Sequence, residues 1–381
     1  MSASSRSITY DAVLSLSLEY IRPGLIDNIF TSTPFLAAVY GAYGRKAKAR
    51  MGVRLVNGGE RIRVPLMYGS NSTVGSYQGY DTLDITPQEG ITTAFYEWKQ
   101  LAASISLSRR EERQNAGEGK IKDIMQAKVM QAEMSLRDEF NYQLLGKTVS
   151  SGAWSSGAGI GNQTAEADFS PVPHMVAKNP SATVTVGNIA QGSYAFWRNV
   201  SVDGSAIHGS KDAAAERGFL CDDWATLGQA MRYTYNACSK GAGGSPDLIL
   251  CDQLGYESYE GAMDDKVRYT AGSGTPGSPA TLGFDSVRFK GANMLWDEMM
   301  PDIDGGLVYT DASWSTSTMM FLNSDFLELV VDTGTNFITT PFVRPENQDA
   351  RTAQILLMGE LCCSQRRKQG VLYGITGGIY A

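Results

Sequence analysis

A long amphipathic helix is the strongest pattern of apolar and polar positions in this chain. Between residues 120 and 145, apolar side chains recur at steps of three and four, as on one stripe of a helix, at Ile121, Met125, Val129, Ala132, Leu136, Phe140 and Leu144. Ile124, Ala127, Met130 and Met134 widen this stripe. The predicted helix would span roughly 40 Å at ~1.5 Å per residue. We therefore expect it to need a large neighbouring element to cover its apolar face.

The segment before this helix predicts an extended β-hairpin over residues 51–108. A turn at residues 57–59 leads into a short alternating strand at 60–66, and a second strand is predicted from Ile91 to Ser108. The stretch 69–90 between them is rich in glycine and tyrosine and is predicted to be a loop. A two-stranded ribbon is only marginally stable in water. Besides the long helix, the natural candidate for its cover is a neighbouring subunit.

The hairpin also carries the candidate binding residues. Aromatic and acidic side chains gather near its tip without basic groups, which fits a protein interface better than a nucleic-acid stack. We expect contacts between subunits at Arg61, Arg63, Tyr68, Tyr77, Tyr80, Asp81 and Asp84. The buried packing of the long helix is assigned to Ile121, Met125, Val129, Leu136, Phe140 and Leu144.

The remaining segments predict an N-terminal arm and a separate α+β unit. Pro23 and Pro34 interrupt the apolar pattern of the first 40 residues, and the basic residues between 45 and 54 are interpreted as a solvated or subunit-facing cluster. Residues 183–335 alternate short strands with helices, one of them starting at Asp222 or Asp223 and ending near Cys238. A strand at 352–363, buried on both sides, and a short strand at 371–375 end the pattern.

Composition narrows the class of protein. A length of 381 residues suggests two or three domains, and a net charge of −7 argues against a protein that coats DNA by neutralising phosphates. We find no secretory signal and no apolar run of membrane length, and so expect a soluble, cytosolic product without a membrane partner. The five cysteines lack metal-like spacing and are predicted to be free thiols.

Catalytic chemistry finds little support. The only histidines, His174 and His208, lie near no hydrolase, zinc or redox motif, so we expect neither an enzyme nor a cofactor. Three acidic pairs offer oxygen ligands for a divalent cation. We interpret them as a helix start and surface turns, with a structural metal as the open alternative: Asp222–Asp223, Asp264–Asp265 and Asp297–Glu298.

The order of these elements resembles that of the major capsid proteins of tailed bacteriophages, an α+β fold of the Hong Kong 97 type. Residues 25–39 resemble the end of the family's N-terminal arm, 58–108 its extended loop, and 119–145 its spine helix. Residues 246–262 and 289–301 resemble its axial domain, and 344–375 its last peripheral strand and exit. No one segment is diagnostic alone. Their order and spacing carry the resemblance.

The resemblance implies a division of the chain and a set of partners. It implies an N-terminal arm at 1–50, an extended β-hairpin loop at 51–108, the spine helix and peripheral domain at 109–182, the axial domain at 183–335, and the peripheral return strand with the C-terminal exit at 336–381. Copies would form hexamers and pentamers of an icosahedral shell that is assembled in the host cytoplasm. The implied partners are a separate scaffolding protein, a portal, a decoration or cement protein, and weakly contacted double-stranded DNA.

Two other interpretations stay open at this point. One is a cargo-holding bacterial nanocompartment of the encapsulin type, which has the same fold but would carry a cargo-docking helix that residues 1–13 do not clearly supply. The other is an α+β enzyme, which the lack of motifs disfavours. Some family members join subunits by an isopeptide bond from a loop lysine. Because residues 51–98 contain no lysine, we expect no such bond here.

Overall fold

The computed structural model of the chain describes eleven stretches, and all structural statements below concern them. These are residues 34–40, 53–114, 124–146, 168–180, 185–205, 217–221, 223–264, 287–297, 299–300, 317–346 and 348–375.

In this described part, a four-stranded sheet has the strand order β1-β13-β14-β4. Its members are β1 (Val53–Val56), β13 (Leu327–Thr339), β14 (Ala350–Cys363) and β4 (Lys99–Ser108). β1 runs parallel to β13, and the other pairs are antiparallel. β14 alternates in burial at its start and is wholly buried from Gly359 to Cys363, so the expected two-sided burial holds only for its end. Gly359 is required there because an added Cβ would lie 2.5 Å from the Val330 carbonyl oxygen.

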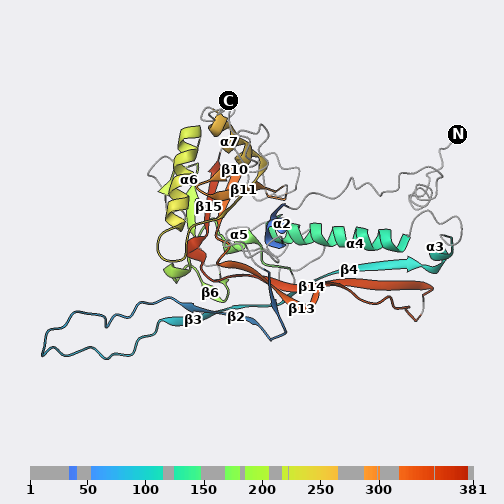
Figure 1. Cartoon of the computed structure of the whole chain (residues 1–381), viewed down its shortest axis with the longest axis horizontal. Coiled ribbons are helices and arrows are strands. Elements are labelled where there is room, and N and C mark those ends of the chain that lie inside the picture. Colours follow the sequence, from blue (N-terminus) through green and yellow to red (C-terminus); the bar gives the residue numbers. More distant parts are fainter. Residues whose placement is uncertain are drawn as a thin grey trace, which may run out of the picture.

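The predicted long helix lies along this sheet beside β4 (Figure 1). Its described part is α4 (Ile124–Asn141), followed by a π-helical turn, η1 (Tyr142–Gly146). The predicted α-helix to residue 145 is therefore corrected at its end. Residues 141–145 are all buried, and the wider turn lets the Gln143 side chain accept a hydrogen bond from the Phe169 N–H at 3.3 Å.

Burial of the helix stripe increases toward its C-terminal end. Leu136, Phe140 and Leu144 are buried, whereas Met125 and Val129 are half-buried. Ile121 lies outside the described residues. Met130, expected to widen the stripe, is 46% exposed. The broad apolar face is thus covered only near the body of the subunit.

The second large sheet of the described structure has seven strands in the order β10-β11-β9-β12-β15-β7-β8. Helices α6 (Trp224–Cys238) and α7 (Gln253–Asp264) pack on it and against each other. Its strands are Val287–Phe289, Ala292–Trp296, Leu248–Cys251, Ser317–Leu322, Gly370–Ile375, Val200–Asp203 and Arg217–Gly218, in that spatial order.

Two strands cross the expected segment boundaries. β13 lies in the four-stranded sheet although it begins at Leu327, inside the expected axial segment, and β15 lies in the seven-stranded sheet although it belongs to the expected peripheral return. After its first passage, from β4 to β7, the chain therefore crosses between the two sheets again at residues 323–326 and at residues 364–369. Asn323 and Gln369 fix the two passages together: the Asn323 N–H donates to Gln369 Oε1 at 2.7 Å, and Gln369 Nε2 donates to the Asn323 carbonyl at 3.0 Å.

The predicted strand from 91 to 108 is two strands with different partners. β3 (Ile91–Tyr96) pairs with β2 (Ile62–Met67), whereas β4 pairs with β14. The break falls at Glu97 and Trp98, where Trp98 Nε1 donates to the Gly59 carbonyl at 2.8 Å. Tyr96 then fixes the base of the β2–β3 ribbon to the sheet, because its hydroxyl donates to the Cys363 carbonyl at 2.8 Å.

Short elements complete the core. A small hairpin of β5 (Thr185–Val186) and β6 (Ile189–Ala190) packs on the ribbon, and Gly187 at its turn has a φ of +58° and lies so close that an added Cβ would be 3.0 Å from Ala94 Cβ. The helical segments are α2 (Pro34–Tyr40), α3 (Arg109–Gln114), α5 (Val172–Met175), η3 (Ala195–Trp197) and η5 (Arg366–Lys368). Buried Asp297, which follows β11, joins α2 and α4 to that strand, because it accepts hydrogen bonds from the Phe35 N–H at 3.3 Å and from Asn141 Nδ2 at 3.0 Å.

Candidate subunit interface

The β2–β3 ribbon carries a loop, residues 68–90, that extends away from the two sheets; we call it the projecting loop (Figure 1). Its neck is narrow, because the N–H of Tyr68 donates to the Gly90 carbonyl at 2.9 Å. An added Cβ at Gly90 would lie 3.1 Å from the Gly69 carbonyl oxygen, so the two backbone segments of the neck approach each other as closely as glycine allows. The neck thus fixes the direction in which the loop leaves the ribbon.

Local side-chain hydrogen bonds shape the loop beyond its neck. Asn71 Oδ1 accepts from the Thr73 N–H at 2.9 Å, and Asp84 Oδ1 accepts from the Thr86 N–H at 3.0 Å and its hydroxyl at 2.5 Å. Asp81 Oδ2 accepts from the Gln78 N–H at 2.8 Å. These are the short-range turns that Asn and Asp favour. They give the loop structure without giving it a core.

The projecting loop exposes large apolar side chains that this copy of the chain does not cover. Tyr80 is fully exposed, Ile85 is 91% exposed, and Val74 is 83% exposed. Tyr77 and Leu83 are also mostly exposed, as are Met67 and Ile91 at the two strand ends. Grouped apolar exposure of this kind marks an interaction surface. The sequence pointed to the tyrosines as interface residues but not to the aliphatic residues near them.

The predicted interface residues fall into two groups. Tyr77, Tyr80, Asp81 and Asp84 lie together in the projecting loop. Arg61 precedes the ribbon, Arg63 lies on it and Tyr68 lies at the neck, and all three contact their own chain. Arg61 forms an ion pair with Glu97 at 3.7 Å, Arg63 a cation–π contact with Phe95, and Tyr68 stacks on Phe196 at 4.9 Å.

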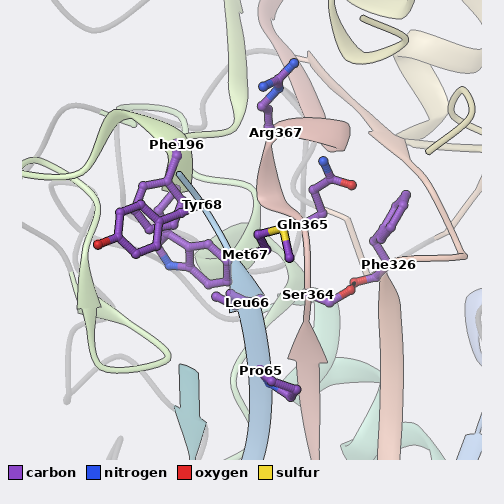
Figure 2. Close-up of a pocket in the computed structure, with 10 residues that line it drawn as sticks. Pro65, Leu66, Met67, Tyr68, Phe196, Phe326, Ser364, Gln365 and Arg367 are labelled. Atoms are coloured by element: carbon purple, nitrogen blue, oxygen red, sulfur yellow. Dashed lines mark hydrogen bonds between the residues drawn. The ribbon is translucent and has the colours of Figure 1, made fainter. Parts of the chain in front are cut away.

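A cleft of about 300 Å³ lies at the base of the ribbon, beside the neck. Figure 2 shows Tyr68 and Phe196 on one side of it and Gln365 and Arg367 on the other. Leu66, Met67, Trp197 and Phe326 add apolar surface, and no acidic residue lines it. Its volume is at the small end of the range for ligand sites, and it lies between the ribbon, η3 and the two segments that connect the sheets.

Two charged side chains, Glu360 in β14 and Arg366 in η5, are buried although no local sequence pattern indicates it. Arg366 donates to the carbonyls of Met175 at 2.8 Å and Trp197 at 3.0 Å, and burial lowers its pKa to about 10. Glu360 accepts from the N–H groups of Ser170 at 3.0 Å and Leu361 at 2.9 Å, and burial raises its pKa to about 8. These contacts join β14 and η5 to segments distant in the sequence, which gives both residues a structural role.

The candidate catalytic and metal residues do not form a reactive group in the described part of the chain. His174 is buried, and burial, followed by the charge of Arg366, lowers its pKa to about 4. His208, Asp222, Asp265 and Glu298 lie outside the described residues. Within the described stretches, no three His, Cys, Asp or Glu side chains gather as metal ligands. The five cysteines are all free and buried, as the sequence predicts.

Among the described helices, none combines the length and apolar character needed to cross a bilayer.

Comparison of the whole chain with known proteins gives its fold. No family model matches the sequence, and no curated protein is significantly similar to it. Solved structures do match. The match to the capsid protein of cyanophage A-1(L) covers 95% of this chain and 98% of that chain, at 16% sequence identity and a TM-score of 0.62. The capsid of a native GTA particle covers 98% and 100% at 14% identity and a TM-score of 0.52. An encapsulin of Synechococcus elongatus covers 98% and 97% at 9% identity and a TM-score of 0.49.

The likeness to the first two structures extends over nearly all of both chains. The chain therefore has the fold of these capsid proteins, which confirms the α+β, Hong Kong 97-like fold expected from the order of its segments.

Proposed function

We propose that this chain is the major capsid protein of a tailed bacteriophage, and that its copies assemble into the hexamers and pentamers of an icosahedral shell around double-stranded DNA. The observation that carries the proposal is the projecting loop, whose apolar side chains have no cover in one subunit. A protein of this fold with such a loop needs a second copy to bury it. The protein then acts as a structural component of the virion and not as an enzyme.

The projecting loop supplies the contact between subunits through Tyr77, Tyr80, Asp81 and Asp84, together with the aliphatic residues Val74, Leu83 and Ile85. Burying one large apolar side chain contributes roughly 1.5–3 kcal/mol, so several of them together stabilise an obligate contact. Arg61, Arg63 and Tyr68 contribute to this contact indirectly, because their contacts within the chain hold the ribbon in position.

The two sheets correspond to the two domains of the shell subunit. The four-stranded sheet with α4 is the peripheral domain, and α4 is its spine helix. The seven-stranded sheet with α6 and α7 is the axial domain, which takes in β15 from the end of the chain. Residues 51–108 contain the extended loop, whereas the N-terminal arm expected at 1–50 lies outside the described residues except for 34–40.

The partners follow from this role. A separate scaffolding protein, a portal and a decoration or cement protein complete the shell, which is assembled in the host cytoplasm. Contact with the packaged DNA is weak and non-specific, because a net charge of −7 leaves little capacity to neutralise phosphates.

The contents of native particles test this function against the nanocompartment alternative. Particles purified from the source and treated with nuclease should contain protected double-stranded DNA of genome length. Shells that instead hold a protein cargo and no DNA would favour a nanocompartment.

A further inference from the structure

The cleft at the base of the ribbon has an aromatic side that is held in place by contacts within the chain (Figure 2). Tyr68 stacks on Phe196 with ring centroids 4.9 Å apart, and the Phe196 ring lies 6.3 Å from that of Trp197. Trp197 is fixed in turn, because its indole N–H donates to the Val186 carbonyl at 2.9 Å. This side of the cleft is therefore a preformed surface for a ring.

The polar side of the cleft is held by two buried cations. Gln365 and Arg367 line the cleft, whereas Arg366 and Lys368, which alternate with them in the sequence, are buried in the protein. Arg366 donates to two backbone carbonyls at 2.8 and 3.0 Å, and Lys368 Nζ donates to three at 3.1–3.2 Å. These bonds fix η5, and they thereby fix the positions from which Gln365 and Arg367 reach the cleft.

The lining selects one class of ligand. Arg367 supplies a guanidinium group, Gln365 an amide and Ser364 a hydroxyl, and none of the described residues that line the cleft is acidic. A guanidinium group binds a carboxylate through paired hydrogen bonds. A cleft of about 300 Å³ suits one ring with a carboxylate beside it better than a larger group. The chemistry that fits is an aromatic carboxylate.

The charge nearby disfavours a nucleic acid in the same cleft. The projecting loop begins at Tyr68, and residues 68–90 contain Asp81, Asp84 and Glu89 but no lysine or arginine, which gives a net charge of −3. A nucleic acid would bring several phosphates close to this loop, with one exposed guanidinium to neutralise them. A ligand with a single carboxylate brings one negative charge, which Arg367 neutralises.

Apolar surface continues from the cleft onto the outside of the subunit. Met67 lines the cleft and is 82% exposed, and Tyr194 is 52% exposed with its ring 5.9 Å from that of Phe196. A free aromatic acid would fill the cleft and leave Met67 and Tyr194 uncovered. A peptide that leaves the cleft across them would bury both, as an interaction surface of this kind requires.

We propose that the cleft binds the C-terminal residue of a partner protein whose chain ends in an aromatic residue. The terminal ring lies against Tyr68 and Phe196, and the terminal carboxylate meets Arg367 and Gln365. The preceding residues of the partner run over the exposed apolar side chains outside the cleft. This binding goes beyond the proposed function, because it assigns the subunit a partner other than its own copies.

Fluorescence anisotropy of a labelled pentapeptide, Gly-Ser-Leu-Ser-Phe with a free C-terminal carboxylate, tests the site on the full chain. The same peptide with an amidated C-terminus should bind at least tenfold more weakly, because it lacks the charge. Arg367→Gln should weaken binding of the acid peptide at least tenfold and leave the amide nearly unchanged, so that the two peptides bind alike. Gln365→Leu should also weaken the acid peptide more than the amide.

Arg232→Gln is the matched control, because Arg232 is an exposed arginine of α6 that does not line the cleft. It should bind both peptides like the wild type. Arg367 is exposed as well, so the melting temperature of Arg367→Gln should stay that of the wild type.

Equal binding of the acid and amide peptides, or an Arg367→Gln protein that keeps the preference for the acid, would overturn the proposal. N-acetylphenylalanine that binds as tightly as the pentapeptide would overturn the partner chain in favour of a free acid. Single-stranded oligothymidylate that binds through Arg367 while the peptide does not would overturn it in favour of a nucleic acid. All these results concern binding per subunit, so they do not depend on whether particles form.

Discussion

At the scale of single residues, Leu136 carries the clearest energetic consequence. Its side chain is 2% exposed and faces the core shared by α4 and the four-stranded sheet. Leu136→Asp removes that apolar burial and adds an unpaired carboxylate, so we expect the free energy of unfolding to fall by about 4 kcal/mol or more. Denaturant titration measures the change. Gln126→Ala on the exposed side of the same helix is the control, expected within about 0.5 kcal/mol; equal losses would mean that the buried face is misassigned.

Glu360 gives the fold a pH dependence. Its pKa is raised from 4.5 to about 8, mainly by burial, so the folded state holds a proton that the unfolded state releases between these pH values. The unfolding free energy should therefore fall as pH rises from about 4.5 to 8, by an amount on the order of 3 kcal/mol at pH 7.

Glu360→Gln keeps an acceptor for the Ser170 and Leu361 N–H groups but cannot ionise. Its stability should match the wild type near pH 5 and exceed it at pH 8, as measured by urea unfolding at both pH values. A parallel pH dependence in the two proteins would contradict the assignment.

Glu360, Arg366 and Lys368 also show what the sequence could not predict. The sequence around them does not distinguish them from exposed charged residues, yet all three are buried. Lys368 Nζ donates to the carbonyls of Lys240, Gly241 and Gly244 at 3.1–3.2 Å. These partners lie more than a hundred residues away in the sequence, so no local sequence pattern predicts the contacts.

At the scale of elements, the projecting loop separates folding from assembly. Replacing residues 70–88 with a short Gly-Ser turn keeps the neck at Gly69 and Gly90 and removes no buried residue. We expect the unfolding free energy to change by about 1 kcal/mol or less. The same variant should lose assembly, because its tyrosines and carboxylates no longer reach a neighbour.

Sedimentation and circular dichroism of this variant check both parts. Normal particles would show that the loop is dispensable for assembly, and an unfolded subunit would show that it belongs to the core.

Elements were predictable wherever one periodic pattern decided them. The apolar stripe was sufficient to predict helix α4, and the alternation of Leu101, Ile105 and Leu107 was sufficient to predict strand β4. The break at Glu97 and Trp98 was not predictable, because apolar alternation continues on both sides while the pairing partner changes from β2 to β14. Likewise β15 is an apolar strand, and its sheet is chosen by distant strands. At the candidate interface, the sequence suggests the tyrosines and aspartates, whose role in binding stays a prediction, whereas Val74 and Ile85 become candidates only through the exposure that the fold reveals.

At the scale of the whole molecule, the shell should be held together without covalent links between subunits. An isopeptide bond needs an amine nucleophile on the loop, and residues 51–98 contain no lysine. Arg54, Arg61 and Arg63 cannot replace it, because a guanidinium group does not act as an amine nucleophile. Lys99 lies in β4, hydrogen-bonded into the four-stranded sheet. Mature particles boiled in detergent with reductant should therefore run as one band near 41.2 kDa; a ladder of larger species would contradict this expectation.

Electron microscopy of the purified, expressed chain, alone and with a co-expressed scaffold, tests the central claim most directly. The account predicts closed, symmetric shells built of rings, because the projecting loop and the exposed part of α4 need a second copy to cover them. A chain that stays monomeric in every condition, at every concentration and with the scaffold present, would contradict it.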